Sequence, residues 1–151
     1  MSIIANTAGS MAFREKIAWL SLGSIAIAFI PYFIWVSISP PTNPLPDFDS
    51  MRLFAAAAVT QMILLGGGHI WLRMRMPDEA RTPADERDRA IAHRAVALAY
   101  YVLISGVILV GCVLPFTKNG WALINAAVAV IVIAELVHYG VSVWCYRRGT
   151  V

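Results

Sequence analysis

Long apolar stretches alternate with short polar connections along this chain of 151 residues. The apolar stretches comprise residues 17–38, 53–72, 95–116 and 121–146. Each is long enough to cross a bilayer as a helix, which needs about 20 predominantly apolar residues. Spanning β-strands would instead alternate apolar and polar residues, whereas residues 126–134 are all apolar. The pattern therefore predicts an all-α membrane protein, a four-transmembrane-helix bundle in one domain over residues 1–151.

The first apolar stretch raises the question of a cleaved signal peptide. It extends from residue 17 to residue 38, whereas the apolar core of a signal peptide has about 7–15 residues. The small residues at 37–39 resemble a cleavage site, but Pro40 follows them directly and disfavours cleavage. We therefore expect this stretch to remain in the protein as its first membrane helix.

The polar connections differ in composition and hence in their expected conformation. Residues 39–51 contain four prolines, which predicts an extended loop without helix. Residues 117–120 are few enough for a tight turn, so the last two helices should form an antiparallel hairpin. Residues 73–94 form a longer, charge-rich connection, which we expect to be a loop that ends in the start of the third helix.

Basic residues lie mostly at one end of the expected bundle. Of the 12 Lys and Arg residues, only Arg52 and Lys118 flank the other end of the spans. Such a bias is typical of the cytoplasmic side of a membrane protein. We therefore predict that both termini and residues 73–94 lie in the cytoplasm.

Composition narrows the range of partners. Hydrophobic residues make up 59% of the chain and charged residues 14%, against about 25% charged residues in soluble domains. The net charge is +3, and the basic residues flank the apolar stretches, which favours membrane anchoring over nucleic-acid binding. We expect the lipid bilayer and no nucleic acid as partner, and we leave open a membrane-protein partner or a homo-oligomer.

A cluster of charges stands where the third helix should begin. The cluster consists of Asp85, Glu86, Arg87, Asp88 and Arg89. Thr82 or Asp85 is a suitable N-cap, with Pro83 near the first turn. Asp85 and Arg89 have the i,i+4 spacing of a helical salt bridge. Two interpretations stay open, a solvated helix cap with anchoring arginines or a docking surface for a partner or for the protein's own helices.

Two short motifs resemble a known group of proteins. The charge cluster at residues 85–89 leads into Ala-Tyr-Tyr-Val-Leu at 99–103, and Glu-Leu-Val-His at 135–138 precedes Tyr-Arg-Arg-Gly at 146–149. Over about the last 70 residues the chain is similar to small bacterial four-helix inner-membrane proteins of unknown function. The first half shows no comparable motif. The resemblance implies a multi-pass protein of the bacterial inner membrane, and it implies no activity.

Polar residues inside the apolar stretches are the candidate functional residues, because polar groups are costly in a bilayer. The fourth stretch contains one acid, Glu135, with His138 three residues later on the same helical face. The second contains Gln61 near its middle and His69 near its basic end. An acid at this depth must face the bundle interior and find a partner, or take up a proton. We predict an intramembrane polar cluster of Glu135, His138, Gln61 and His69.

The chemistry of this cluster is open between several interpretations. The plainest is an interhelical hydrogen-bond network, and the next is a proton or cation site at Glu135. Glu135, His138 and His69 also hold the donor atoms of a mononuclear metal site, and the two histidines could ligate a haem from two helices. A di-metal site would need a second Glu-x-x-His pair and two more acids. Because the ligand set is small, we predict no metal and no cofactor.

No catalytic residues are predicted. The sequence Gly66-Gly67-Gly68 lacks the Gly-Lys-Ser/Thr of a phosphate-binding loop. The three glycines lie in an apolar stretch, where we expect them to let another helix pack closely. Cys112 and Cys145 fall near opposite faces of the bilayer, which excludes a disulfide between them.

Three classes of function follow from these observations. The favoured one is a non-enzymatic subunit or regulator that acts through helix packing and its charged cytoplasmic loop. The first alternative is a small transporter or channel component with Glu135 as a proton or cation site. The second is a haem- or metal-binding redox membrane protein that uses His69, His138 and Glu135.

Overall fold

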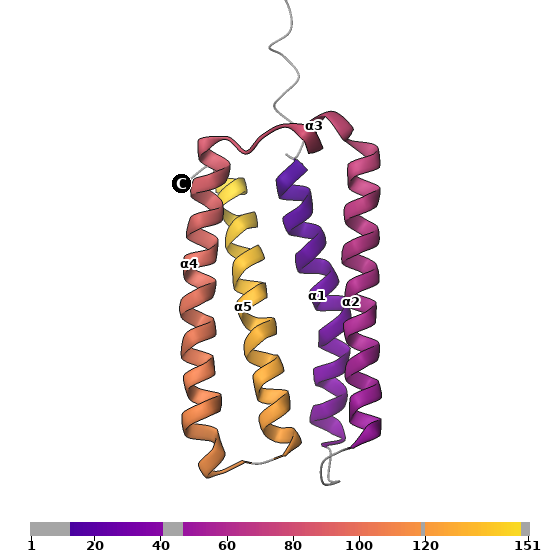
Figure 1. Cartoon of the computed structure of the whole chain (residues 1–151), viewed down its shortest axis with the longest axis vertical. Coiled ribbons are helices and arrows are strands. Elements are labelled where there is room, and N and C mark those ends of the chain that lie inside the picture. The colour runs from indigo at the N-terminus through magenta and orange to yellow at the C-terminus, as the bar shows by residue number, and fades with distance from the viewer. Residues whose placement is uncertain (1–12, 41–46, 119, 149–151) are drawn as a thin grey trace, which may run out of the picture.

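The computed structural model describes residues 13–40, 47–118 and 120–148, and these contain helices and no strand (Figure 1). The helices are α1 (Phe13–Ile38), α2 (Phe48–Arg75), α3 (Pro77–Arg81), α4 (Glu86–Ile108) and α5 (Trp121–Arg148). A π-helical turn (Leu109–Val113) and a 3-10 turn (Leu114–Phe116) continue α4. Four helices of the described part are long and apolar enough to cross a membrane. The prediction of an all-α protein with four spanning helices is confirmed.

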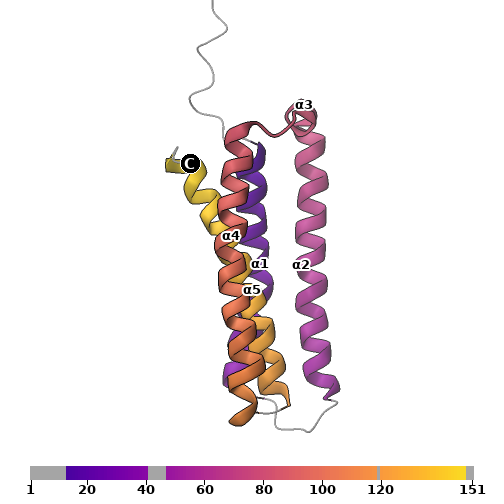
Figure 2. The same ribbon diagram turned by 60° about the vertical axis from the view of Figure 1, so that its left-hand side comes forward.

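The four long helices stand side by side in the order α4, α5, α1, α2 (Figure 1). The inner helices α1 and α5 pack against each other, and each also packs against one outer helix. In a view turned by 60°, α2 still stands away from α4 (Figure 2). In the most apolar stretch of each helix, 33% of α1 and 22% of α5 is buried, against 6% of α2 and none of α4. The apolar stretches of the outer helices therefore contain almost no buried residues.

Small side chains let the inner helices approach their neighbours closely, as is common where membrane helices pack. The buried residues of α1 are Ala18, Ser21, Ser24, Ile25, Ala28 and Tyr32. Between α4 and α5, Ala95 and Cys145 are fully buried. A side chain at Gly106 of α4 would collide with Val130 of α5, so only glycine fits there.

The connection at residues 39–51 is shorter than predicted. We expected no helix in it, but α2 begins at Phe48, so the prediction is wrong for residues 48–51. The last proline of the connection is Pro46, and Asp47 directly after it caps the helix by accepting a hydrogen bond from the Asp49 amide. A carboxylate N-cap satisfies one of the amides that a helix start leaves free, so helix can begin as soon as the prolines end.

The connection at residues 73–94 is largely helical. Only residue 76 and residues 82–85 lie outside α2, α3 and α4. Of the two predicted starts of the third helix, Asp85 is the N-cap, and its side chain accepts from the Asp88 amide at 2.6 Å. Thr82 ends α3 instead.

Proline also explains the irregular end of α4. Pro115 has no amide hydrogen, and its ring would clash with the carbonyl of residue 111 in a regular α-helix. The chain widens into the π-helical turn just before it, where the Leu114 amide donates to the Leu109 carbonyl. A tighter 3-10 turn then contains the proline itself.

One end of the molecule gathers the charges, and we call it the basic end. It holds the start of α1, the end of α2, α3, the start of α4 and the end of α5 (Figure 1). Arginines lie over tryptophan rings here, at 5.4 Å for Arg75 on Trp71 and 5.1 Å for Arg147 on Trp19. Such pairs suit a membrane–water interface, where the ring stays apolar and the cation reaches water.

Candidate functional site

Glu135 lies in the middle of α5, 14 residues after Trp121 and 13 residues before Arg148. At about 1.5 Å per residue it is roughly 20 Å from either end of the helix, near the centre of a bilayer. Its side chain is 48% exposed in the isolated chain. The helix therefore holds a carboxyl group at the depth where charge is most costly, with room for another group beside it.

The predicted pair of Glu135 and His138 is present. Glu135 Oε2 and His138 Nδ1 are 3.8 Å apart, which is an electrostatic contact and longer than a hydrogen bond. The His138 ring stacks on Tyr139 with 4.7 Å between ring centroids. The imidazole is thus held in place beside the carboxyl group without occupying its oxygen atoms.

A cavity of about 300 Å³ opens between α1, α2 and α5, and we call it the Glu135 cavity. Its lining consists of Ile25, Phe29, Phe54, Gln61, Leu65, Val128, Ile131, Val132, Glu135 and Tyr139. The walls are apolar except for Gln61, Glu135 and Tyr139. No lysine or arginine of the described residues lines it. The cavity therefore presents one acid in apolar surroundings.

The predicted residue Gln61 belongs to this cavity, and its neighbours fix its orientation. Ser24 of α1 donates its hydroxyl hydrogen to the Ser21 carbonyl at 2.9 Å. Its oxygen can therefore only accept from Gln61, whose Nε2 lies 3.3 Å away. Gln61 Oε1 is then buried, and no group of the described residues donates to it. The cavity is thus lined by the Glu135 carboxyl group and by Gln61, whose carbonyl oxygen is buried and has no donor among the described residues.

A second cavity of about 240 Å³ lies between α1, α4 and α5, and we call it the basic-end cavity. His138 and Ser142 line it from α5, together with Asp88 of α4 and Arg14 of α1. Tyr139 lines both the Glu135 cavity and the basic-end cavity. His138 and Tyr139 therefore stand between Glu135 and the polar end of the protein.

A polar network at the mouth of this cavity ties three helices together. Asp88 pairs with Arg14 at 3.0 Å and accepts a hydrogen bond from the Tyr146 hydroxyl at 2.8 Å. Arg147 of α5 pairs with Glu15 of α1 at 3.8 Å. The ion pair at the start of α4 thus runs from Asp88 to another helix, while Asp85, which we expected to pair with Arg89, serves as the N-cap.

The other residues of the charge cluster point outward. Asp85, Glu86, Arg87 and Arg89 are exposed, whereas Asp88 is half-buried. Arg87 makes a long hydrogen bond, of 3.4 Å, to the Tyr146 carbonyl. The cluster therefore contains Asp88, which is half-buried and joins three helices, and four exposed residues, of which Arg87 reaches α5 through one long hydrogen bond.

His69, the fourth predicted member of the polar cluster, is set apart from the others. It lines neither the Glu135 cavity nor the basic-end cavity, and its Nε2 is buried with no partner among the described residues. Within the described ranges, no three His, Cys, Asp or Glu side chains are grouped so that they could hold a metal ion. The metal set of Glu135, His138 and His69 is not brought together.

The three glycines of α2 have different surroundings. A side chain at Gly68 would collide with Leu20 of α1, so this glycine allows the two helices to approach. Gly66 and Gly67 have nothing near the place where a side chain would stand. Close packing inside the chain therefore involves Gly68, and no other helix of the described residues packs against Gly66 or Gly67.

Some functional side chains escaped the sequence analysis. Ser24 and Asn125 lie inside apolar stretches, where a polar residue could have been noted in the same way as Gln61. Asn125 accepts a hydrogen bond of 2.6 Å from the Tyr32 hydroxyl, which joins α5 to α1. Tyr139 gave no signal, because an aromatic residue near a span end is common.

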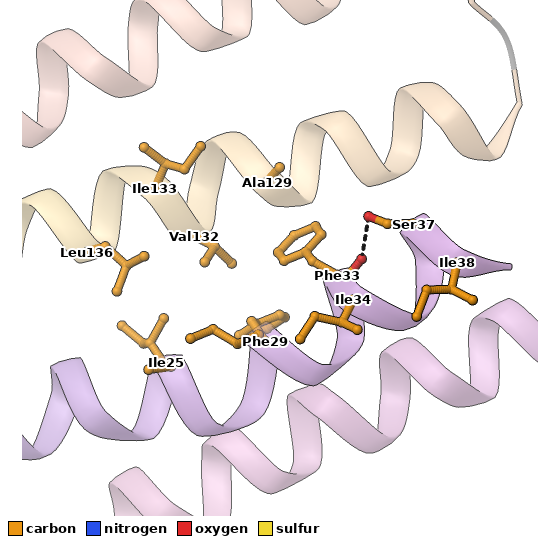
Figure 3. A pocket seen from close by; sticks show the side chains of 12 residues that line it. Ile25, Phe29, Phe33, Ile34, Ser37, Ile38, Ala129, Val132, Ile133 and Leu136 are labelled. Atoms are coloured by element: carbon orange, nitrogen blue, oxygen red, sulfur yellow. Dashed lines mark hydrogen bonds between the residues drawn. The ribbon is translucent and has the colours of Figure 1, made fainter. Parts of the chain in front are cut away.

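An apolar groove of about 520 Å³ lies between α1 and α5 and shares part of its wall with the Glu135 cavity (Figure 3). The shared residues are Ile25, Phe29 and Val132. Its one polar side chain, Ser37, donates to the Phe33 carbonyl of its own helix at 2.7 Å. We call this hollow the apolar groove, since it holds no charged group.

Together, four apolar helices and charged connections define an integral membrane protein. The chain belongs to the family described as "Predicted membrane protein (DUF2178)", whose model matches residues 14–150. The match includes both halves of the chain, whereas the sequence motifs had pointed only to the second. Comparison with curated proteins and comparison with solved structures give no match. The resemblance to small uncharacterised membrane proteins is thereby confirmed, and the family indicates no enzymatic class.

Proposed function

We propose that this protein is a non-enzymatic subunit or regulator of a membrane assembly, with the outer face of α2 as its contact surface. The observation that carries the proposal is a stripe of mostly small residues on the exposed side of α2. The stripe consists of Ala56, Thr60, Ile63 and Gly67, all of which are exposed. Their spacing of four, three and four residues places them on one side of the helix.

Small residues matter here because lipid tails give no hydrophobic reason for helices to associate. Helices in membranes associate where backbones approach closely, and small residues permit that approach. Gly68 performs this role inside the chain, whereas Gly67 has open space beside it. The exposed charges at Asp85, Glu86, Arg87 and Arg89 supply a second, polar contact outside the membrane.

The test is the mass of protein per particle, without its lipid and polymer, in membrane patches extracted by polymer without detergent. We expect the wild type to exceed the 16.5 kDa of one chain, and Gly67→Leu to return it to the mass of one chain. Val107→Leu, at an exposed position of α4, is the matched control and should leave the assembly intact. A wild type that occurs as a single chain would contradict the proposal.

We propose as a second candidate that the protein is a small transporter or channel component with Glu135 as a proton or cation site. The Glu135 cavity favours it, because the carboxyl group lies near the bilayer centre and no basic residue of the described part lines the cavity. His138 is in contact with Glu135 and lines the basic-end cavity. This arrangement offers protons a way between Glu135 and the basic end.

Infrared difference spectroscopy of the full chain in lipid, recorded during a pH titration, tests this second candidate. The carboxyl signal that changes with pH should lose one component in Glu135→Gln and keep it in Glu86→Gln, where the altered acid is exposed outside the spans. If the spectra of wild type and Glu135→Gln are the same throughout, Glu135 exchanges no proton and the candidate fails.

A further inference from the structure

We propose that the Glu135 cavity binds a small, membrane-soluble organic ammonium ion, with its charged nitrogen between Glu135 and Gln61 and its apolar part against the cavity walls. The inference deepens the second candidate function, a cation site at Glu135, and rests on it. It names the chemical class of the cation. Four features of the cavity support this class.

The first feature is the charge. A carboxyl group near the bilayer centre needs a positive partner in order to stay ionised, because a lone charge there is costly. Among the described residues, no lysine or arginine lines the cavity. The facing titratable groups are His138 and Tyr139 of α5, and α1 and α2 contribute none to the lining. A cationic ligand would complete the site.

The second feature is the unused acceptor. Gln61 Oε1 is buried without a donor, while the amide nitrogen of the same side chain is engaged by Ser24. A buried polar atom without a partner is destabilising and is rare in folded proteins. An ammonium ion beside the Glu135 carboxylate supplies N–H donors, and a turn of the Gln61 side chain would expose its oxygen to them.

The third feature argues against a calcium or magnesium ion. Calcium and magnesium need six or more oxygen ligands. The polar atoms in the described lining are the Glu135 carboxylate, the Gln61 carbonyl and the Tyr139 hydroxyl. The remaining lining residues are apolar, so they cannot replace the water that such an ion would lose. An organic cation needs few polar contacts and uses the apolar walls.

The fourth feature is the size and the aromatic content of the cavity. About 300 Å³ is at the small end of the range for small-molecule pockets, so the ligand is small. Phe29, Phe54 and Tyr139 belong to the lining, and aromatic rings attract ammonium groups. Lipid headgroups lie at the membrane surface, about 15 Å from the centre. The ligand is therefore a separate amine dissolved in the membrane and not the headgroup of a bilayer lipid.

The experiment measures binding of three probes to the full chain in lipid nanodiscs by calorimetry. Hexylamine carries charge and N–H donors, hexyltrimethylammonium carries charge without donors, and hexanol carries no charge. All three probes also partition into lipid, which contributes heat of its own. Binding to the cavity is therefore taken as the heat measured with wild type minus the heat measured with Glu135→Gln, a variant of equal size. We expect hexylamine to bind most tightly and Glu135→Gln to weaken it at least about tenfold.

Two further sets of variants separate the features. Gln61→Leu should reduce the preference for hexylamine over hexyltrimethylammonium, because one of the two acceptors is lost and only the Glu135 carboxylate remains. Leu65→Trp fills the Glu135 cavity and should abolish binding, whereas Leu136→Trp fills the apolar groove and should leave binding unchanged. Circular dichroism and elution volume confirm that each variant remains folded.

Several results would overturn the inference. Equal binding of hexanol and hexylamine to wild type would mean that the cavity selects only for apolar character. Hexylamine binding that survives Glu135→Gln would place the site elsewhere. If hexylamine does not bind but the infrared titration still detects Glu135, the proposal of an ammonium ligand is wrong, and the second candidate function, a proton or cation site at Glu135, is retained. If the infrared titration also shows no Glu135 signal, the proposal of an ammonium ligand and the second candidate function are both wrong.

Discussion

The Glu135 cavity and the apolar groove share three wall residues, and yet they differ in chemistry. Ile25, Phe29 and Val132 contribute to both hollows. The groove lies between α1 and α5 and offers only hydrocarbon and one serine, whose hydroxyl is already bonded to its own helix (Figure 3). The cavity gains Phe54, Gln61 and Leu65 from α2. The third helix therefore adds a polar side chain, Gln61, to walls that are partly shared with an apolar surface.

The sequence of α5 shows how one helix serves both hollows. Residues 129, 133 and 136 face the groove, and residues 128, 131, 135 and 139 face the cavity. Each set follows the spacing of three and four residues that marks one side of a helix. The only acid of the helix, Glu135, belongs to the second set. Its position along the helix therefore decides which of the two hollows is polar.

The largest expected effect is the difference in reporter activity between the two ends of the molecule. It tells which side of the membrane the Glu135 cavity and the apolar groove are nearer to. The basic-end cavity adjoins the Glu135 cavity, whereas the groove reaches Ile38 at the other end of α1. From the basic residues we predict that the basic end is cytoplasmic. A reporter fused at residue 82 should be active only in the cytoplasm, and one at residue 118 only outside it. A periplasmic signal at residue 82 would invert the assignment.

The next effect tests whether the groove tolerates charge. Ile133→Glu places a second carboxyl group on the groove side of α5, where the described lining offers no polar partner. We expect the free energy of unfolding in lipid to fall by about 3 kcal/mol. Ile133→Leu keeps the apolar character and should change it by less than about 0.5 kcal/mol. If the acid is tolerated as well as leucine, the groove contains water or a donor, and the contrast between the hollows is lost.

A smaller effect should follow from moving α2 away from α1. Gly68→Val forces a side chain into Leu20, which should lower the free energy of unfolding by about 1–3 kcal/mol and open the Glu135 cavity. Gly66→Val makes the same chemical change where there is open space, and valine has a higher helix propensity than glycine, so this variant should show no loss of stability. Denaturant titration of both variants in the same lipid measures the difference. Equal losses would show that α2 is not held through Gly68.

Much of the fold could be read from the sequence because membrane spans depend on length and apolar character alone. The four spans and the N-cap at Asp85 required no knowledge of tertiary contacts. The start of α2 at Phe48 was not predicted, because the four prolines suggested that the whole connection lacks helix. Their effect ends at Pro46, and Asp47 already caps the helix. A sequence pattern predicts that a segment is helical more accurately than it predicts the residue at which the helix begins.

The candidate site was only partly predictable, because it depends on which helices are neighbours. Glu135 and His138 lie on one helix, so their spacing was sufficient to pair them. Gln61 was expected in the cluster, but its bond to Ser24 requires α1 to lie beside α2. His69 was included for its depth alone, and it lines neither cavity. Depth in the membrane can be counted along the chain, whereas the direction of a side chain depends on the packing.

The smallest expected effect compares two serines of α1, one beside each hollow. Ser24 and Ser37 both donate to a carbonyl of their own helix, but only Ser24 also accepts from another helix, through Gln61. Ser24→Ala should therefore lower the free energy of unfolding by about 0.6 kcal/mol, the average for a hydrogen bond between membrane helices. Ser37→Ala removes only an exposed bond within one helix, so we expect no measurable change.

The Ser24 variant has a second consequence that stability alone would not reveal. Without the serine oxygen, the Gln61 amide is free to turn, and either its carbonyl or its nitrogen can face a ligand. The preference for hexylamine over hexyltrimethylammonium should therefore decrease in Ser24→Ala and stay as in the wild type in Ser37→Ala. This preference is measured by the binding of both probes to the two variants. An unchanged preference in Ser24→Ala would show that the carbonyl is held by something other than Ser24.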